Sequence, residues 1–159
     1  MGKEKRTPAG EALSGMILDL FRVSSLALTA GDRLVAPLGL TSARWQILGA
    51  IIRAERPQPV AWIARDLGTH RQNVQRIIND LNKDGLVDFE PNPHHRRAQL
   101  VVLTDKGRRA FSEAMQMQAP WISRIADGIT VKELEAVRRV INALKENLEA
   151  EESLSRRDR

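Results

Sequence analysis

The sequence predicts a mostly α-helical chain that carries one small β-hairpin. Apolar residues recur at helical spacing through most of the 159 residues, and two short aliphatic runs flank a turn that contains proline. The length suits one domain, or one domain with an extension for oligomerisation. Cysteine is absent, so the fold must rest on packing alone, without disulfides or thiolate metal sites.

The first predicted helix covers residues 9–33, where apolar side chains recur every three or four positions. Val23 and Leu26 lie outside the main apolar stripe, which is typical of a helix that contacts both its own domain and a partner subunit. No window reaches the apolar length expected of a membrane span, and no signal-peptide core follows the basic N-terminus. We therefore expect a cytoplasmic protein without a membrane segment.

A second helix is predicted to begin at Thr41 or Ser42, because either hydroxyl side chain can cap a helix start. Trp45 and the aliphatic residues after it supply its apolar side. Pro57 and Pro59 then break the helix, since proline lacks the backbone N–H that a continuing helix needs.

Residues 63–81 have the spacing of a helix-turn-helix, in which two short helices cross tightly. Gly68 supplies the turn, and Thr69 with Gln72 has the spacing of a capping box. The second helix has a single apolar stripe, formed by Val74, Ile77, Ile78 and Leu81. Its outward face holds side chains that read base edges in the major groove: Arg71, Gln72, Gln75, Arg76 and Asn79. The alternative is an ordinary helical hairpin whose polar face meets water.

Two short runs after this motif predict the β-hairpin. Residues 86–90 alternate apolar and polar side chains, and residues 98–103 are rich in aliphatic residues. The tip between them, PNPHHRR, is basic. His94 and His95 are weak candidates for a metal site, because strand neighbours point apart and the flanking arginines oppose a bound cation. We expect no metal and a tip that faces water or phosphate.

The last part of the chain predicts two more helices. Thr104 caps the first and Gly128 ends it, while Thr130 and Glu133 form a capping box for the second. Apolar residues of the final helix alternate at three and four positions, as in a coiled-coil seam: Leu134, Val137, Ile141, Leu144 and Leu148. This seam predicts a helical partner, either in a second subunit or in the first helix of the same chain.

Composition and charge restrict the function. The chain has 25 Lys and Arg against 20 Asp and Glu, a net charge of +5 that favours polyanionic partners. It has no cysteine and no glycine-rich nucleotide-binding motif, and two of its three histidines share the hairpin tip. We therefore expect neither enzymatic activity nor a cofactor. A helix-turn-helix used only for protein contacts would have a neutral outward face, and Arg71 and Arg76 argue against that alternative.

The order of these elements, with three stretches of sequence, resembles the MarR family of bacterial winged-helix transcription regulators. The stretches are LGLTSARWQIL at 38–48, VQRIINDLNKDGLV at 74–87 and RRAQLVVLTDKG at 96–107. The resemblance implies one domain over residues 1–159, with a winged helix-turn-helix at 41–104 and dimerisation helices at 9–33 and 105–152. It also implies a homodimer that binds successive major grooves of a palindromic operator in double-stranded DNA.

The resemblance further implies roles for individual residues. On the motif positions, the base-reading residues would be Arg71, Gln72, Asn73, Gln75 and Arg76, and the wing arginine would be Arg97. The outward face of the helix and the basic hairpin tip add four further candidates for DNA contact: Asn79, His94, His95 and Arg96. Most family members are repressors, and many are released by a small aromatic or phenolic effector. A pocket for such an effector would be lined by Met16, Phe21, Trp45, Met115 and Trp121, which also fit a plain apolar core.

The hairpin tip departs from the family in one place. The family has an acidic residue two positions before the wing arginine, and this chain has His95 two positions before Arg97. An imidazole does not accept hydrogen bonds from arginine as a carboxylate does. The wing is therefore expected to be either looser or held by a different group.

Overall fold

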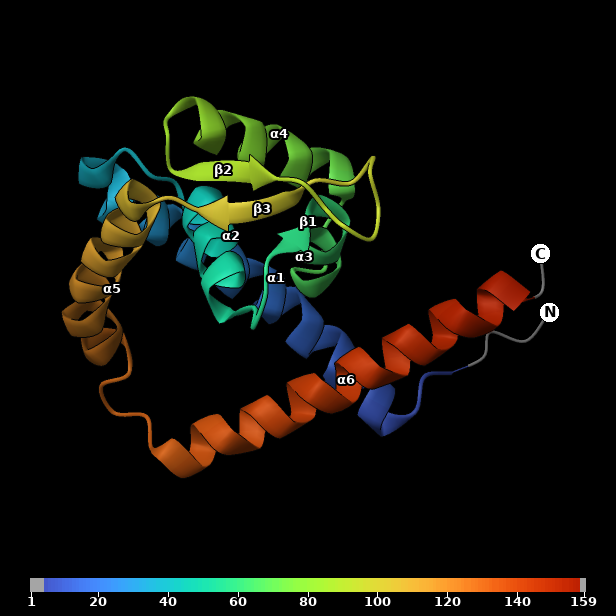
Figure 1. The fold of residues 1–159 in the computed structure, drawn as a ribbon. Helices are drawn as coiled ribbons and strands as arrows, with labels where there is room; N and C mark the ends of the chain where they lie inside the picture. The colour runs from blue at the N-terminus through green and yellow to red at the C-terminus, as the bar shows by residue number, and fades with distance from the viewer. Residues whose placement is uncertain (1–4, 158–159) are drawn as a thin grey trace. The chain divides into compact units, whose positions relative to one another are not determined.

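The computed structural model describes residues 5–157 of the chain. The chain forms two compact units, residues 1–118 and residues 119–159. Figure 1 labels the elements in chain order, and their bounds are α1 (Pro8–Val35), η1 (Ala36–Leu38), α2 (Ser42–Arg53), β1 (Gln58–Pro59), α3 (Val60–Asp66), α4 (Arg71–Lys83), β2 (Val87–Glu90), β3 (Leu100–Leu103), α5 (Asp105–Ile125) and α6 (Val131–Arg157). The predicted fold class, mostly helical with a small antiparallel sheet, is confirmed.

The small sheet has three antiparallel strands in the order β1-β3-β2, one more than the predicted hairpin. β2 and β3 pair along their full length, starting with Val87 opposite Leu103. They and the tip between them form the wing. β1 adds only Gln58 and Pro59 on the other side of β3. A strand of two residues is too short to show the alternation of apolar and polar side chains from which strands are predicted, and its proline is typical of an edge strand.

The apolar core of residues 1–118 lies where α2, α3 and α4 meet the sheet. The predicted apolar stripe of α4 is buried. The largest fully buried side chains come from these elements and from the end of α1: Val35 of α1, Ile47 and Leu48 of α2, Ile63 of α3, Val74, Ile78 and Leu81 of α4, and Val87 and Val101 of the sheet. This packing holds α4 with its polar side outward.

A buried serine ties α1 to the start of α2. The backbone N–H of Ser42 donates to a carboxylate oxygen of Asp32 at 2.6 Å, and its hydroxyl donates to the carbonyl oxygen of Leu28 at 2.7 Å. Gly31 permits this contact, because a Cβ atom added there would lie 2.5 Å from the Ser42 hydroxyl oxygen. Thr41 caps α2 with its side chain, as one of the two predicted caps. The winged helix-turn-helix is therefore fastened to α1.

Three consecutive carbonyl groups at the exit of α4 accept hydrogen bonds from the residues that start α5, a contact we call the 84–86 junction. Lys106 Nζ donates to the carbonyl of Asp84 at 2.7 Å, and the Thr104 hydroxyl donates to that of Gly85 at 2.7 Å. The backbone N–H of Thr104 donates to the carbonyl of Leu86 at 3.2 Å. The Thr104 hydroxyl also caps α5, as predicted. The junction therefore holds the end of α4 and the start of β2 against α5.

Within residues 119–159, α6 begins with the predicted capping box. The N–H of Glu133 donates to the Thr130 hydroxyl oxygen at 3.3 Å. The Glu133 carboxylate accepts from the Thr130 hydroxyl at 2.7 Å and from its backbone N–H at 2.8 Å. These two hydrogen bonds lower the pKa of the Glu133 carboxyl below its ordinary value, and the bond from the Thr130 hydroxyl has the larger effect.

The lowered pKa predicts how the capping box responds to acid. The ionised Glu133 carboxylate stabilises the folded chain fully above the ordinary pKa of 4.5, and this contribution is lost as the pH falls through the lower folded-state value. We expect Glu133→Gln to be less stable than the parent near neutral pH, and the difference to shrink on acidification. Urea unfolding at several pH values measures it, with Glu135→Gln in the same helical turn as the control. A difference that stays constant with pH would contradict this role.

Large apolar side chains are exposed on α1 and on α6 in the single chain. On α1 they are Leu18, Phe21, Val23, Leu26 and Leu28. On α6 they include Leu134, Val137, Val140, Ile141 and Leu148.

The expectation that no window is apolar enough for a membrane span is wrong for the first helical segment. Residues Pro8–Leu38 contain an 18-residue window with a mean hydropathy of 1.4, which has the length and composition of a span. Length and composition alone do not distinguish such a span from a helix that a protein partner covers.

Candidate nucleic-acid interface

The turn between α3 and α4 satisfies carbonyl groups at the end of α3 with two backbone hydrogen bonds. The N–H of Thr69 donates to the carbonyl of Ala64, and the N–H of Gly68 donates to that of Arg65, each at 3.0 Å. Gly68 has a φ of 62°, a left-handed conformation that favours glycine. Thr69 does not cap α4: the residue at the cap position is His70, and no side chain makes a capping hydrogen bond.

α4 carries the predicted base-reading residues on its outward side. Gln75 is half-buried, and the others are exposed: Arg71, Gln72, Asn73, Arg76 and Asn79. The Gln75 amide donates to the side-chain oxygen of Asn79 at 3.0 Å, and the Arg76 guanidinium donates to that of Asn73 at 3.1 Å. Within the described part of the chain, the Arg71 and Gln72 side chains make no hydrogen bond. They are therefore free to contact a partner.

The wing tip is closed by Asn92. Its side-chain amide donates to the carbonyl of Ala98 at 2.9 Å, and its side-chain oxygen accepts from the N–H of His94 at 3.0 Å. The tip, which lacks the acidic residue that the family resemblance leads us to expect at the position of His95, is thus ordered by Asn92. Among residues 5–157, Arg97 has no carboxylate partner, and its side chain stays exposed.

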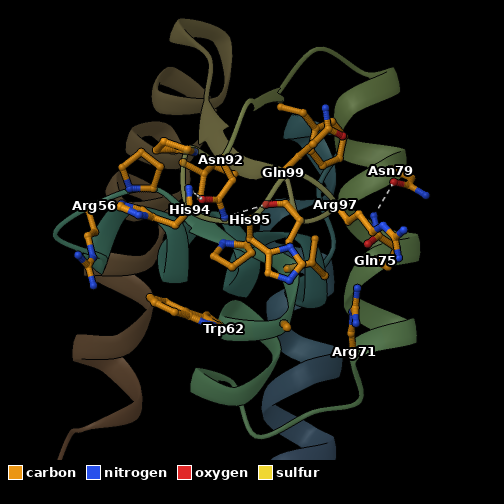
Figure 2. Close-up of a pocket in the computed structure, with 18 residues that line it drawn as sticks. Arg56, Trp62, Arg71, Gln75, Asn79, Asn92, His94, His95, Arg97 and Gln99 are labelled. Carbon is orange, nitrogen blue, oxygen red and sulfur yellow. Dashed lines mark hydrogen bonds between the residues drawn. The ribbon is translucent and has the colours of Figure 1, made fainter.

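The wing, α4 and the segment around the start of α3 surround an open hollow of about 990 Å³, which we call the recognition hollow (Figure 2). It brings together residues predicted from separate stretches: Arg71, Gln75 and Asn79 of α4, and His94, His95 and Arg97 of the wing. The other predicted DNA-contacting residues lie outside its lining: Gln72, Asn73, Arg76 and Arg96. None of the lining residues is acidic, so the hollow suits a negatively charged ligand.

Residues 56–62 form a third wall of the recognition hollow that sequence reasoning missed. Arg56 and Trp62 both line it, and Trp62 is 41% exposed. The guanidinium carbons of Arg56 and Arg65 lie 5.7 Å and 5.8 Å from the centroid of the Trp62 ring. The sequence signal was an isolated tryptophan with arginines on both sides, just before the turn at Gly68.

Arg44 of α2 holds the far end of α4. Its guanidinium donates to the carbonyl of Gly39 at 2.9 Å and to the carboxylate of Asp84, the residue that follows α4. The Arg44 side chain is mostly buried, so water screens this ion pair less than it screens a surface pair. Together with the 84–86 junction, the pair fixes α4 against α2 and the sheet.

The five residues expected to line an effector pocket do not line the recognition hollow. Trp45 packs against the apolar core, whereas Phe21 and Met115 are exposed. Trp121 lies in the other compact unit, residues 119–159. A pocket formed by Met16, Phe21, Trp45, Met115 and Trp121 therefore stays a prediction.

Comparison with known proteins agrees with this arrangement. Residues 38–98 match a family model described as MarR family. An uncharacterized protein of Mycobacterium tuberculosis is 36% identical over 139 residues, 85% of this chain and 96% of that protein. Transcriptional activatory protein BadR of Rhodopseudomonas palustris is 31% identical over 108 residues, 67% of this chain and 62% of that protein. The structure of M. tuberculosis transcriptional regulator MosR in complex with DNA has a TM-score of 0.72 at 25% identity, over 84% of this chain and 96% of that one.

Proposed function

Because this chain belongs to the MarR family of transcription regulators, we propose that it binds a palindromic operator in double-stranded DNA as a homodimer and represses transcription there. The recognition hollow carries this proposal. Arg71, Gln75 and Asn79 of α4 meet Arg97 of the wing around one hollow without an acidic lining residue. Arg, Gln and Asn make paired hydrogen bonds to base edges, and a helix fits the major groove.

The exposed apolar residues of α1 and α6 support the homodimer. Monomeric proteins rarely leave so many large apolar side chains in water, and the seam of α6 has the spacing that suits a helical partner. A second copy of the chain would cover these residues and place two copies of α4 about one helical turn, roughly 10 bp, apart on a palindrome. We also propose a cytoplasmic location, in which a second copy of the chain covers the apolar surface of α1.

The proposed regulation has two parts. A small aromatic or phenolic effector would release the operator from a pocket near Met16, Phe21, Trp45, Met115 and Trp121, a proposal that rests on the family resemblance. Activation of transcription is the second candidate, because the relative BadR is named a transcriptional activatory protein. Transcription from an operator-bearing promoter, measured with and without the protein, distinguishes repression from activation.

Selection of bound fragments from random double-stranded DNA tests the proposed function. We expect one palindromic sequence to be enriched, with half-sites about one helical turn apart. Enrichment of no sequence would contradict operator recognition and favour a winged helix used for protein contacts.

Substitutions on α4 test base recognition on the enriched operator. Arg71→Ala or Gln72→Ala should weaken binding to the operator by roughly 1 to 3 kcal/mol and binding to random DNA far less, because each removes a contact to a base edge. Fluorescence anisotropy at fixed salt measures both affinities. Lys83→Ala, which removes a charge at the other end of the same helix, is the matched control. Equal losses on operator and random DNA would show that these residues contact only the backbone.

A further inference from the structure

We propose that Trp62 and Arg56 contact the sugar-phosphate backbone of the operator: the Trp62 ring packs on a deoxyribose, and Arg56 binds the neighbouring phosphate. This inference rests on the proposed function, since it requires DNA to lie across the recognition hollow. It adds the segment before the helix-turn-helix to the DNA-contacting surface, which otherwise consists of α4 and the wing.

The shape of the hollow places this segment on the path of a DNA strand. Figure 2 shows Arg56 and Trp62 across the hollow from Arg71 and Gln75 of α4, with the wing histidines between them. A duplex with α4 in its major groove has a backbone strand along each edge of that groove. A strand that runs between α4 and the wing would therefore pass through the hollow and meet the third wall.

The surroundings of Trp62 suit a sugar and a phosphate. The ring is partly exposed, so part of its apolar surface can contact a partner, and among the described residues its N–H donates no hydrogen bond. Two guanidinium groups lie over the ring. Arg65 is also engaged by the Asp66 carboxylate at 3.5 Å, whereas Arg56 has no carboxylate partner among residues 5–157. Arg56 is thus the cation that is oriented by the ring and free to bind phosphate.

Backbone contact and base recognition differ in what they predict for sequence dependence. Every nucleotide presents the same sugar and phosphate, so losing these contacts weakens binding to all sequences by the same factor. If Trp62 had only a structural role, its substitution would lower the stability of the free protein. If Arg56 did not bind phosphate, its substitution would leave the salt dependence of DNA binding unchanged.

The experiment compares four variants by anisotropy on operator and random duplexes over a range of salt. Trp62→Ala should weaken binding to both duplexes by about tenfold, and Trp62→Phe, which keeps a ring, by clearly less. Arg56→Ala should reduce the slope of log affinity against log salt by about 0.9, the value for one lost phosphate contact, whereas Arg56→Lys should keep the slope. Thermal unfolding of the free proteins shows that each variant is folded.

Acrylamide quenching of tryptophan fluorescence gives a second readout that does not depend on affinity. Operator binding should protect part of the parent fluorescence from acrylamide, and this protected part should be missing in Trp62→Phe. Parent-like affinities and salt slopes in the alanine variants, with no protection of the parent on operator DNA, would overturn the inference and leave operator binding by α4 intact. A parent protein that binds no duplex would overturn the proposed function itself, and the inference with it.

Discussion

Replacing both Ile141 and Leu144 of α6 by glutamate is expected to give a monomeric or unfolded chain that no longer binds operator DNA. Both residues lie on the apolar seam of α6, and Ile141 is 41% exposed in the single chain. In the proposed homodimer a partner helix covers them, so two carboxylates would be buried without partners, at a cost of several kcal/mol. Light scattering should show the loss of the dimer mass, and anisotropy the loss of operator binding.

The matched control for this change places the same charges on the opposite side of α6. Ala143→Glu combined with Ala150→Glu introduces two carboxylates at exposed positions two residues beyond seam residues. This variant should keep the dimer mass and the operator affinity of the parent. A soluble Ile141→Glu, Leu144→Glu protein with the dimer mass and normal affinity would show that the seam is not the interface.

Gly107→Ala is expected to lower the free energy of unfolding by about 3 kcal/mol or more, through overpacking against the backbone. A Cβ atom at residue 107 would lie 2.0 Å from the carbonyl oxygen of Leu86 and 3.0 Å from Leu103 Cδ2. Because the closer atom belongs to the backbone, the 84–86 junction must open or α5 must move. Urea unfolding measures the loss of stability.

Arg108→Ala is the control for the alanine itself, since residue 108 lies in the same helical turn and is exposed. Its effect on the free energy of unfolding should stay within about 0.5 kcal/mol. Gly107→Ala should also reduce operator affinity, because the displaced junction holds the exit of α4. Unchanged stability of Gly107→Ala would mean that the contact with Leu86 relaxes at no cost.

The sequence predicted those parts of the interface that local periodicity determines. The apolar stripe of α4 is buried, and the polar residues between its members therefore face outward. Gly68 forms the expected turn, and the structure shows that it does so in a left-handed conformation. These features depend on residues within a few positions of one another.

Features that depend on distant pairing were missed. β1 exists only because Gln58 pairs with Val101, far along the chain. The third wall of the recognition hollow arises because the wing tip returns beside Trp62, which no spacing in the sequence indicates. The prediction that Thr69 caps α4 was wrong for a local reason. The backbone N–H of Thr69 takes part in the turn that ends α3, and α4 begins at Arg71 with His70 at the cap position, one residue later than the predicted capping box requires.

The way the wing is held also determines where its length can change. Its base is held by the 84–86 junction, and its tip is closed by the hydrogen bonds of Asn92 to Ala98 and His94. An inserted or deleted residue within β2 or β3 would turn core side chains such as Val101 towards solvent. An insertion at residues 93–97 avoids that cost because the tip lies outside the paired strands, so the wing can be lengthened there while α4 keeps its place.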